Sequence, residues 1–187
     1  GQTRMGELQM ATNDGHTYNY SSQNDNVQIS THIANTDRSS WWWGDEWQSA
    51  YWAALAGQGA WLVWDRLPAA TQREVANMIV YEANRFLTVP APYNEFRDTK
   101  AEENAWNSRI LVLAYCMMPN HPNRAVWEEK ANEYMISAFA TPQDVSSSRI
   151  VDGKPLNQWL QGPNVHSDYT LENHGFVHPD YTTTYHH

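Results

Sequence analysis

Two segments of the chain gather side chains that could transfer protons or bind a sugar. Residues 98–106 combine acids with a lysine, an asparagine and a tryptophan, and residues 173–181 are dense in asparagine, histidine and tyrosine. Side chains of these kinds act as general acids and bases when they lie within hydrogen-bond reach of a substrate. That chemistry sets no rule for spacing along the sequence. The elements that carry the two segments therefore decide whether they meet.

In the second segment, Asn173, His174 and Tyr181 are the candidate catalytic residues, and His178 is a candidate substrate-binding residue. An amide or imidazole can bind a carboxylate, and a phenol or imidazole can exchange protons. The same residues also suit turns, because Asn-His-Gly and His-Pro-Asp are good turn formers. Both interpretations stay open at this point.

The acids of the first segment suggest a second chemistry. An inverting glycoside hydrolase needs two carboxyl groups about 6.5–9.5 Å apart. Thr99 and Glu102 match a capping box, which explains Glu102 as part of a helix start. Glu103 has no such explanation, so it is the preferred catalytic acid, paired with Asp45 or Asp98. The helix dipole alone also favours acids at this position.

The chain is rich in the aromatic residues that have a polar group. It contains 10 Trp and 10 Tyr but 4 Phe. Trp41, Trp42 and Trp43 are consecutive, so their side chains cannot all be buried on one face and at least one is expected to be exposed. They could form a platform on which sugar rings stack, or they could seal the rim of a helical barrel. Asn104 and Trp106 are further candidate substrate-binding residues, as are Asp45 and Asp98.

The histidines and acids do not form a recognisable metal motif. His174 and His178 are four residues apart, but Gly175 and Pro179 argue against the helix that would align them, and no HExxH motif is present. The Asn- and Asp-rich turns within residues 13–26 do not have the spacing of an EF-hand loop. We therefore expect no metal and no cofactor.

The elements that must position these residues are predicted to be helices. Residues 1–38 are polar and rich in turn signals, with a short strand expected at 27–33 and a short helix at 4–12. Residues 39–187 are expected to form one helical domain. Long helices are predicted at residues 47–67, 73–87, 99–118 and 124–139. A hairpin turn is predicted at Asp152-Gly153, followed by a short helical turn in residues 155–160.

Two of these helices are amphipathic and two are apolar around most of their circumference. The apolar ones, 47–67 and 99–118, are expected to be buried, including Cys116. A second capping box, Thr71 with Glu74, marks the start of helix 73–87. The side chains expected to be buried on the amphipathic helices are Val75, Ile79, Ala83, Phe86, Trp127, Ala131, Tyr134 and Ala138. Those expected in solvent are Glu82, Glu128, Glu129, Lys130 and Glu133.

This alternation of buried and surface helices is typical of an (α/α) toroid or solenoid. Parallel inner helices place their N-termini on one rim, so residues 41–47, 98–106 and 173–181 are predicted to converge there. Four long helices are too few to close a barrel. We therefore expect an all-α fold of helical hairpins in an incomplete toroid. Other chains, or a missing part of the same protein, would complete it.

Residues 98–106 and 173–181 resemble segments of uncharacterised bacterial (α/α) toroid proteins that are similar to heparinase II/III-like polysaccharide lyases. The resemblance covers residues 40–181. It implies an exported bacterial protein, secreted or periplasmic. It also implies that Asn173 or His174 neutralises the carboxylate of a uronate and that Tyr181 or His174 exchanges protons with the sugar.

The function expected from the sequence is therefore carbohydrate chemistry. A polysaccharide lyase acting by β-elimination on an acidic polysaccharide comes first, and an inverting glycoside hydrolase is the alternative. A carbohydrate-binding or interaction module without catalysis is the third reading. The net charge of −9 argues against a nucleic-acid partner. No run of about 20 apolar residues is present, so no membrane span is expected.

Overall fold

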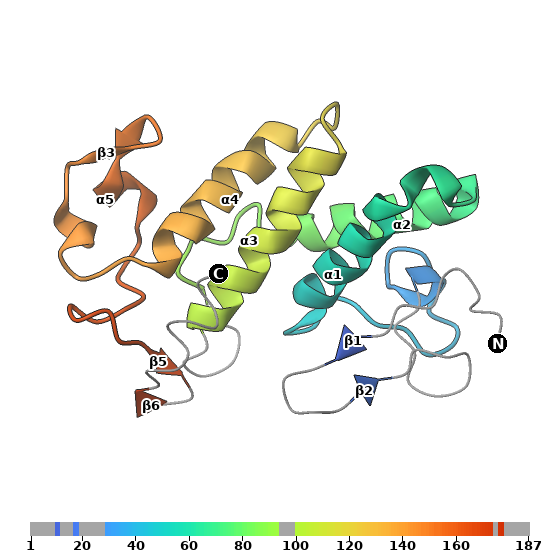
Figure 1. The fold of residues 1–187 in the computed structure, drawn as a ribbon, viewed down its shortest axis with the longest axis horizontal. Coiled ribbons are helices and arrows are strands. Elements are labelled where there is room, and N and C mark those ends of the chain that lie inside the picture. The colour runs from blue at the N-terminus through green and yellow to red at the C-terminus, as the bar shows by residue number, and fades with distance from the viewer. Residues whose placement is uncertain (1–9, 12–16, 19–28, 94–99, 174–175, 178–187) are drawn as a thin grey trace. The chain divides into compact units, whose positions relative to one another are not determined.

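A computed structural model of the chain describes residues 10–11, 17–18, 29–93, 100–173 and 176–177. It is mostly helical, with helices packed on helices and three pairs of very short strands (Figure 1). The chain divides into two compact units, Gly1–Glu82 (unit 1) and Ala83–His187 (unit 2). Each unit is described by itself. No helix in the described part of the chain combines the length and apolar character needed to cross a bilayer.

Unit 1 begins with elements that the sequence did not predict correctly. Strand β1 (Met10–Ala11) pairs antiparallel with β2 (Thr17–Tyr18), so the helix expected at residues 4–12 is wrong at Met10–Ala11, and residues 4–9 lie outside the described part. The strand expected at residues 27–33 is replaced by a 3-10 turn, η1 (Ile29–Thr31). Instead of a strand, the described part of this segment makes an isolated parallel bridge between His32 and Trp43.

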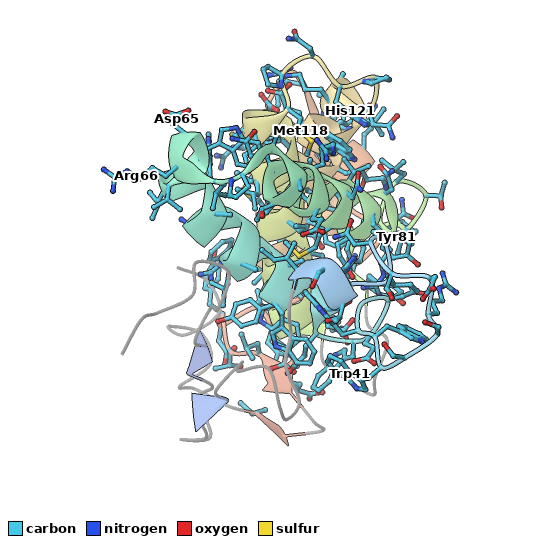
Figure 2. The ribbon with its side chains drawn as sticks, turned by 90° about the vertical axis from the view of Figure 1, so that its right-hand side faces the viewer. Trp41, Asp65, Arg66, Tyr81, Met118 and His121 are labelled. Carbon is cyan, nitrogen blue, oxygen red and sulfur yellow. The ribbon has the colours of Figure 1, made fainter. Side chains whose placement is uncertain are left out.

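Helix α1 (Ser49–Leu62) is shorter than the predicted helix, and a 3-10 turn, η2 (Trp64–Arg66), follows it. The prediction that this helix is buried on all sides is wrong at its C-terminal end. Trp61 and Val63 are exposed, and Leu62 is 84% exposed. Figure 2 shows Asp65 and Arg66 of η2 pointing away from the ribbon. The buried residues of α1 are Ser49, Ala50, Ala53, Ala54, Ala56, Gly57 and Ala60, mostly too small to mark one face in the sequence.

Helix α2 (Ala69–Asn84) buries the face that its periodicity predicts. Val75, Ile79, Ala83 and Phe86 are all buried. The predicted capping box is wrong, because the helix begins before Thr71 and the Pro68 carbonyl accepts a bond from the Gln72 N–H. The prediction that Glu82 lies in solvent is also wrong, since this side chain is fully buried.

Unit 2 is built on an antiparallel hairpin of α3 (Lys100–Met117) and α4 (Arg124–Ala138), which pack along each other (Figure 1). Both predicted C-terminal ends lie one residue beyond the observed ones. The predicted stripe of α4 is confirmed, because Trp127, Ala131, Tyr134 and Ala138 are all buried. Cys116 was expected to be buried but is exposed, in the last turn of α3.

The end of α2 joins this hairpin through hydrogen bonds within unit 2. The Asn84 Oδ1 accepts from Trp127 Nε1 at 3.0 Å and from Asn123 Nδ2 at 3.0 Å. The imidazole of His121 stacks on the Trp127 ring with the centroids 4.3 Å apart. The turn between α3 and α4 is therefore fixed by polar and aromatic contacts to a fully buried indole.

The rest of unit 2 is irregular, with short elements. In chain order they are η3 (Asp144–Ser146), β3 (Ile150–Val151), β4 (Lys154–Pro155), α5 (Leu156–Trp159), β5 (Glu172–Asn173) and β6 (Phe176–Val177). The predicted hairpin is confirmed: β3 pairs with β4 across Asp152 and Gly153, whose φ angles of 46° and 81° are left-handed. Beside it, Ala140, Leu156, Trp159 and Leu160 form a small second core.

Candidate functional site

The loop that carries the three tryptophans turns sharply between Trp43 and Asp45. Gly44 has a φ of 106° and Asp45 a φ of 60°, both in the left-handed region. The turn places Trp43 in the core at 1% exposure and leaves Trp41 and Trp42 at the surface, 51% and 36% exposed. The expectation that at least one of the three is exposed is confirmed. The buried ring of Trp43 presents no face to a ligand.

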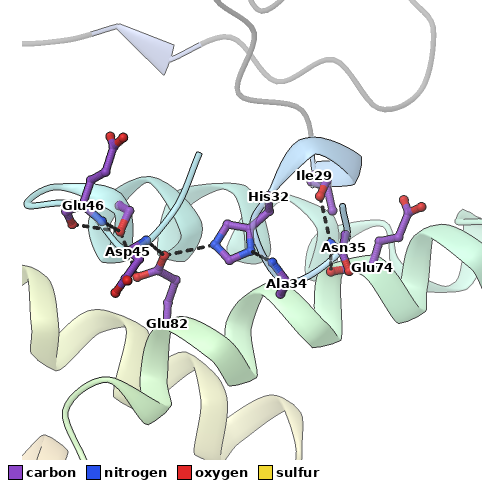
Figure 3. Close-up of polar contacts among 9 residues, drawn as sticks. Ile29, His32, Ala34, Asn35, Asp45, Glu46, Glu74 and Glu82 are labelled. Carbon is purple, nitrogen blue, oxygen red and sulfur yellow. Dashed lines mark hydrogen bonds and ion pairs between the residues drawn. The ribbon is translucent and has the colours of Figure 1, made fainter. Parts of the chain in front are cut away.

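Behind this loop lies a buried polar cluster centred on Glu82 (Figure 3). The carboxylate Oε1 accepts from His32 Nε2 at 3.0 Å and from the backbone N–H of Asp45 at 3.0 Å. The Ser49 hydroxyl donates to Oε2 at 2.9 Å. The His32 Nδ1 accepts from the Ala34 N–H, so the ring proton lies on Nε2. Glu82 thus ties α2 to three earlier segments of unit 1.

Gly44 is required by the closeness of this cluster. A Cβ at this position would lie 2.6 Å from His32 Nε2 and 2.8 Å from Ile33 Cγ2, and the backbone is left-handed as well. Only glycine meets both conditions without strain. On the other faces of the imidazole lie the rings of Trp43 and Tyr81, with centroids 4.6 Å and 5.5 Å away. His32 is therefore enclosed.

The residue types of this cluster match a hydrolase triad, but their order does not. In a serine triad the histidine lies between the nucleophile and the acid, so that it can take the hydroxyl proton. Here the carboxylate of Glu82 lies between Ser49 and His32, and the second nitrogen of His32 is occupied by the Ala34 N–H. All three side chains are fully buried. The arrangement can hold a loop but cannot activate Ser49 as a nucleophile.

The sequence contains a signal for this cluster in the position of Glu82 along α2. Buried residues of α2 fall at Val75, Met78, Ile79 and Ala83, and Glu82 occupies the same face at the same period. An acidic residue at a position that the helical period assigns to the apolar face predicts a buried, paired carboxylate. Its partners could not be named, because they come from residues 33 to 50 positions away.

In unit 2, the first turns of α3 bury polar side chains. Glu102, Glu103, Asn104 and Asn107 are all at most 3% exposed, and Trp106 is buried beside them. Asn104 is used structurally: its Oδ1 accepts from the Tyr93 N–H at 3.0 Å and its Nδ2 donates to the Lys100 carbonyl. The capping box expected for Glu102 depends on Thr99, which lies outside the described residues.

Helix α4 holds the same proline-rich segment, residues 89–93, from another side. Glu133 accepts from the Ala91 N–H at 2.7 Å and from Lys130 Nζ at 2.9 Å. Lys130 also donates to the Val89 carbonyl at 3.0 Å, and the Tyr134 hydroxyl reaches the same oxygen at 3.3 Å. The prediction that Lys130 and Glu133 are solvated is wrong, since their side chains are 15% and 14% exposed.

Of the α4 residues predicted to lie in solvent, Glu128 and Glu129 do so, with side chains 43% and 62% exposed. Glu128 pairs with Arg124 one helical turn earlier, and Glu129 pairs with Lys154 of the hairpin. Exposed pairs of this kind contribute little to stability. Of the four charged residues 128, 129, 130 and 133 of α4, two therefore hold a loop and two lie at the surface.

Tyr134 is kept protonated by its surroundings. Burial is the main reason that the pKa of Tyr134 is raised above its ordinary value, and the charges of Glu133 and Glu103 and the neighbouring Tyr93 add to the effect. The influence of Glu103 places this acid in the electrostatic environment of the Tyr134 ring. At neutral pH Tyr134 can donate a hydrogen bond, but it cannot act as a base.

The predicted catalytic residues are described only in part. Asp98, His174, His178 and Tyr181 lie outside the described residues. Asn173 is in β5, where it pairs with Phe176, and β5 packs against α3. In Figure 1, β5 lies next to the end of α3 where the helix begins. Of the predicted segment 173–181, the described residues lie in β5 and β6, and β5 packs against α3 within unit 2.

The other predicted site residues fall in one unit or the other. Trp41, Trp42, Trp43 and Asp45 belong to unit 1, whereas Glu103, Asn104 and Trp106 belong to unit 2. Asp45 is exposed, and its backbone N–H, not its side chain, makes the bond to Glu82. Among the described residues, no group of three or more His, Cys, Asp or Glu side chains is placed to hold a metal ion.

Comparison with known proteins adds no relative to this picture. No protein-family model matches the chain, no curated protein matches it in sequence, and no solved structure matches it. The resemblance to polysaccharide lyases therefore stays a prediction from residues 98–106 and 173–181.

Proposed function

We propose that this chain acts on carbohydrate, and that its reaction is β-elimination in an acidic polysaccharide. The observation that carries the proposal is the packing of β5, which contains Asn173, against α3, whose first turn buries Glu103. Strand β5 and helix α3 are far apart in sequence but pack against each other. The proposal includes an (α/α) toroid fold, supported by the α3–α4 hairpin, and an exported, secreted or periplasmic location.

The proposed reaction needs a carboxylate binder and a proton carrier. Asn173 or His174 binds the uronate carboxylate, which makes the neighbouring C5 proton more acidic. Tyr181 or His174 takes that proton as a general base. The electron pair forms the C4–C5 double bond as the C4–O bond breaks. The leaving oxygen then receives a proton from the same group or from water.

The test is the ultraviolet absorbance of the conjugated product during incubation with a panel of acidic polysaccharides. We expect absorbance to rise with the wild-type chain, and Tyr181→Phe to lower the rate by about 10²-fold or more. Tyr169→Phe is the matched control, because Tyr169 is an exposed tyrosine of unit 2 outside the proposed site. It should retain the wild-type rate.

The same incubations separate the alternatives. Absence of ultraviolet absorbance across the panel rules out β-elimination. Release of reducing sugar without absorbance indicates the inverting hydrolase, with Glu103 as the preferred acid and Asp45 or Asp98 as its partner. If Tyr181→Phe and Tyr169→Phe behave alike while the wild type is active, Tyr181 is not the proton carrier.

One observation favours a second candidate, a carbohydrate-binding module without catalysis. Trp41 and Trp42 are adjacent exposed indoles on a loop that is fixed from behind by Trp43 and Glu82. Flat aromatic faces held rigidly in solvent suit the stacking of sugar rings. Binding to polysaccharide with neither product would support this candidate over both enzymes.

A further inference from the structure

We propose that Arg38, Trp41 and Trp42 form a binding surface on unit 1 that recognises the negatively charged group of a saccharide. Arg38 is the residue that selects acidic over neutral sugars. The saccharide part of this inference rests on the proposed function. The charge selection rests on the contacts of Arg38.

Arg38 lies against Trp42 at the surface, and Trp41 precedes Trp42 in the chain. Trp41 and Trp42 are exposed, and Arg38 is exposed as well. The guanidinium carbon of Arg38 lies 5.6 Å from the centre of the Trp42 ring. At this distance the cation is attracted to the face of the indole. The contact keeps the guanidinium beside the Trp42 ring without using its hydrogen-bond donors.

The charge of Arg38 is available for a ligand. In the part of the chain that the structure describes, Arg38 makes its cation–π contact and a backbone hydrogen bond, but no ion pair. Its planar group has paired donors that match a carboxylate or sulfate in two-point contact. Arg38 therefore presents a positive charge on a chain whose net charge is −9.

The backbone holds this surface in a set shape. Arg38 has a φ of 63°, which is unfavourable for a residue with a side chain, and the Arg38 N–H is 3.3 Å from Thr36 Oγ1. Just before it, the Asp37 carboxylate accepts from the backbone N–H and the hydroxyl of Ser39. Just after it, Trp43 is fixed by backbone bonds with Thr31 and Ile33.

The strained backbone at Arg38 is explained if it positions the side chain for ligand binding. Strained residues of this kind cluster at binding sites, where the surrounding structure maintains them. A sugar ring stacked on Trp41 or Trp42 places its carboxylate or sulfate within reach of the neighbouring guanidinium. Preorganised side chains lose little conformational entropy on binding, which favours affinity.

The experiment measures binding of the full chain to a uronate polysaccharide, alginate, and to its carboxyl-reduced form as the neutral probe. Isothermal titration calorimetry gives the affinities. We expect Arg38→Gln to weaken alginate binding about tenfold and to leave binding of the neutral form unchanged. Trp41→Ala should weaken binding of both forms. Arg66→Gln, which removes an exposed arginine from η2 of the same unit, is the matched control and should change neither.

Equal losses for Arg38→Gln and Arg66→Gln would overturn the inference, because they would indicate a general charge effect. So would wild-type binding that does not distinguish the two probes, or that is absent for both. Far-ultraviolet circular dichroism of each variant confirms its fold, and Arg38→Lys adds a variant that keeps the charge but lacks the paired donors. Lyase activity is measured on the same samples. Charge-selective binding without activity contradicts the proposed reaction alone, and activity with unselective binding contradicts this inference alone.

Discussion

Units 1 and 2 each use a carboxylate to hold a loop, but they meet its charge in different ways. In unit 1, Glu82 is fully buried and accepts from the neutral donors His32, Asp45 N–H and Ser49. In unit 2, Glu133 is 14% exposed and pairs with Lys130 on the same helix. A cation one turn away and contact with water make the second carboxylate easier to accommodate.

The two loops should differ in how strongly they respond to loss of their carboxylate. Glu82 depends on donors that arrive from three separate segments, so its environment exists only when unit 1 is folded. Glu133 keeps its cation in any helical conformation of α4, because Lys130 is three residues away on that helix. Loss of Glu82 should therefore affect the tertiary structure far more than loss of Glu133.

The largest expected effect is the difference between Glu82→Ala and Glu133→Ala. Removal of Glu82 leaves buried donors without an acceptor, so we expect the free energy of unfolding to fall by about 3 kcal/mol. Removal of Glu133 leaves one backbone donor, the Ala91 N–H, without its acceptor, while Lys130 keeps the Val89 carbonyl and contact with water, so we expect about 1 kcal/mol. Urea denaturation followed by tryptophan fluorescence measures both.

Glu74→Ala is the control for this comparison, because Glu74 lies on α2 and contacts Asn35 through its backbone carbonyl. It should have little effect on stability. Equal losses for the Glu82 and Glu133 variants would contradict the contrast between the two units.

A smaller effect is expected at high pH, and it should belong to unit 2. Burial raises the pKa of Tyr134 above its ordinary value of 10.0, so above this pH an unfolded chain releases a proton that the folded chain retains. Stability from this residue is present below pH 10 and falls as the pH rises further, by at most about 1.4 kcal/mol per pH unit. Tyr134→Phe should flatten that fall in unfolding measured at a series of pH values. An unchanged slope would show that the tyrosine ionises freely in the folded chain.

The smallest effect concerns two exposed turns, one in each unit. Asp37 accepts from the N–H and hydroxyl of Ser39, and Asp168 accepts in the same way from Thr170. These hydrogen bonds lower the pKa of each carboxyl below 3.8. The stability they contribute is present above that value and is lost as the pH falls.

Carboxyl titrations by nuclear magnetic resonance should find both pKa values below 3.8. Ser39→Ala should raise the pKa of Asp37, and Thr170→Ala that of Asp168, each without affecting the other. A pKa that does not respond to its own substitution would show that the turn is open in solution.

Periodicity in the sequence was sufficient to predict most of the helices. Val75, Ile79 and Ala83 recur on one face of α2, and Trp127 and Tyr134 do so on α4, because large apolar residues show which side of a helix is buried. Helix α1 gave no such pattern. Its apolar residues lie on all faces, so the period did not show that Trp61, Leu62 and Val63 at its C-terminal end are exposed.

The candidate site was less predictable, because its geometry depends on contacts between distant residues. That at least one of the three consecutive tryptophans is exposed followed from their spacing, but not that Trp43 would be the buried one. The burial of Glu82 needed donors from residues 32, 45 and 49, which no local pattern connects. Of the four residues chosen for catalysis, Glu103 and the backbone of Asn173 lie in the described part, and His174 and Tyr181 lie outside it.

The position of Glu82 also bears on how the chain could be divided into fragments. The boundary between the two units falls after Glu82, inside helix α2, which continues to Asn84. A truncation after Glu82 would remove the last residues of α2, 83 and 84. The last carbonyls of the shortened helix would then lose their N–H donors. The truncation would also leave Asn84, the acceptor for the Trp127 indole, one residue from the new N-terminus of unit 2. Contacts define two units, but no cut between residues 82 and 84 would leave both with an intact helix terminus.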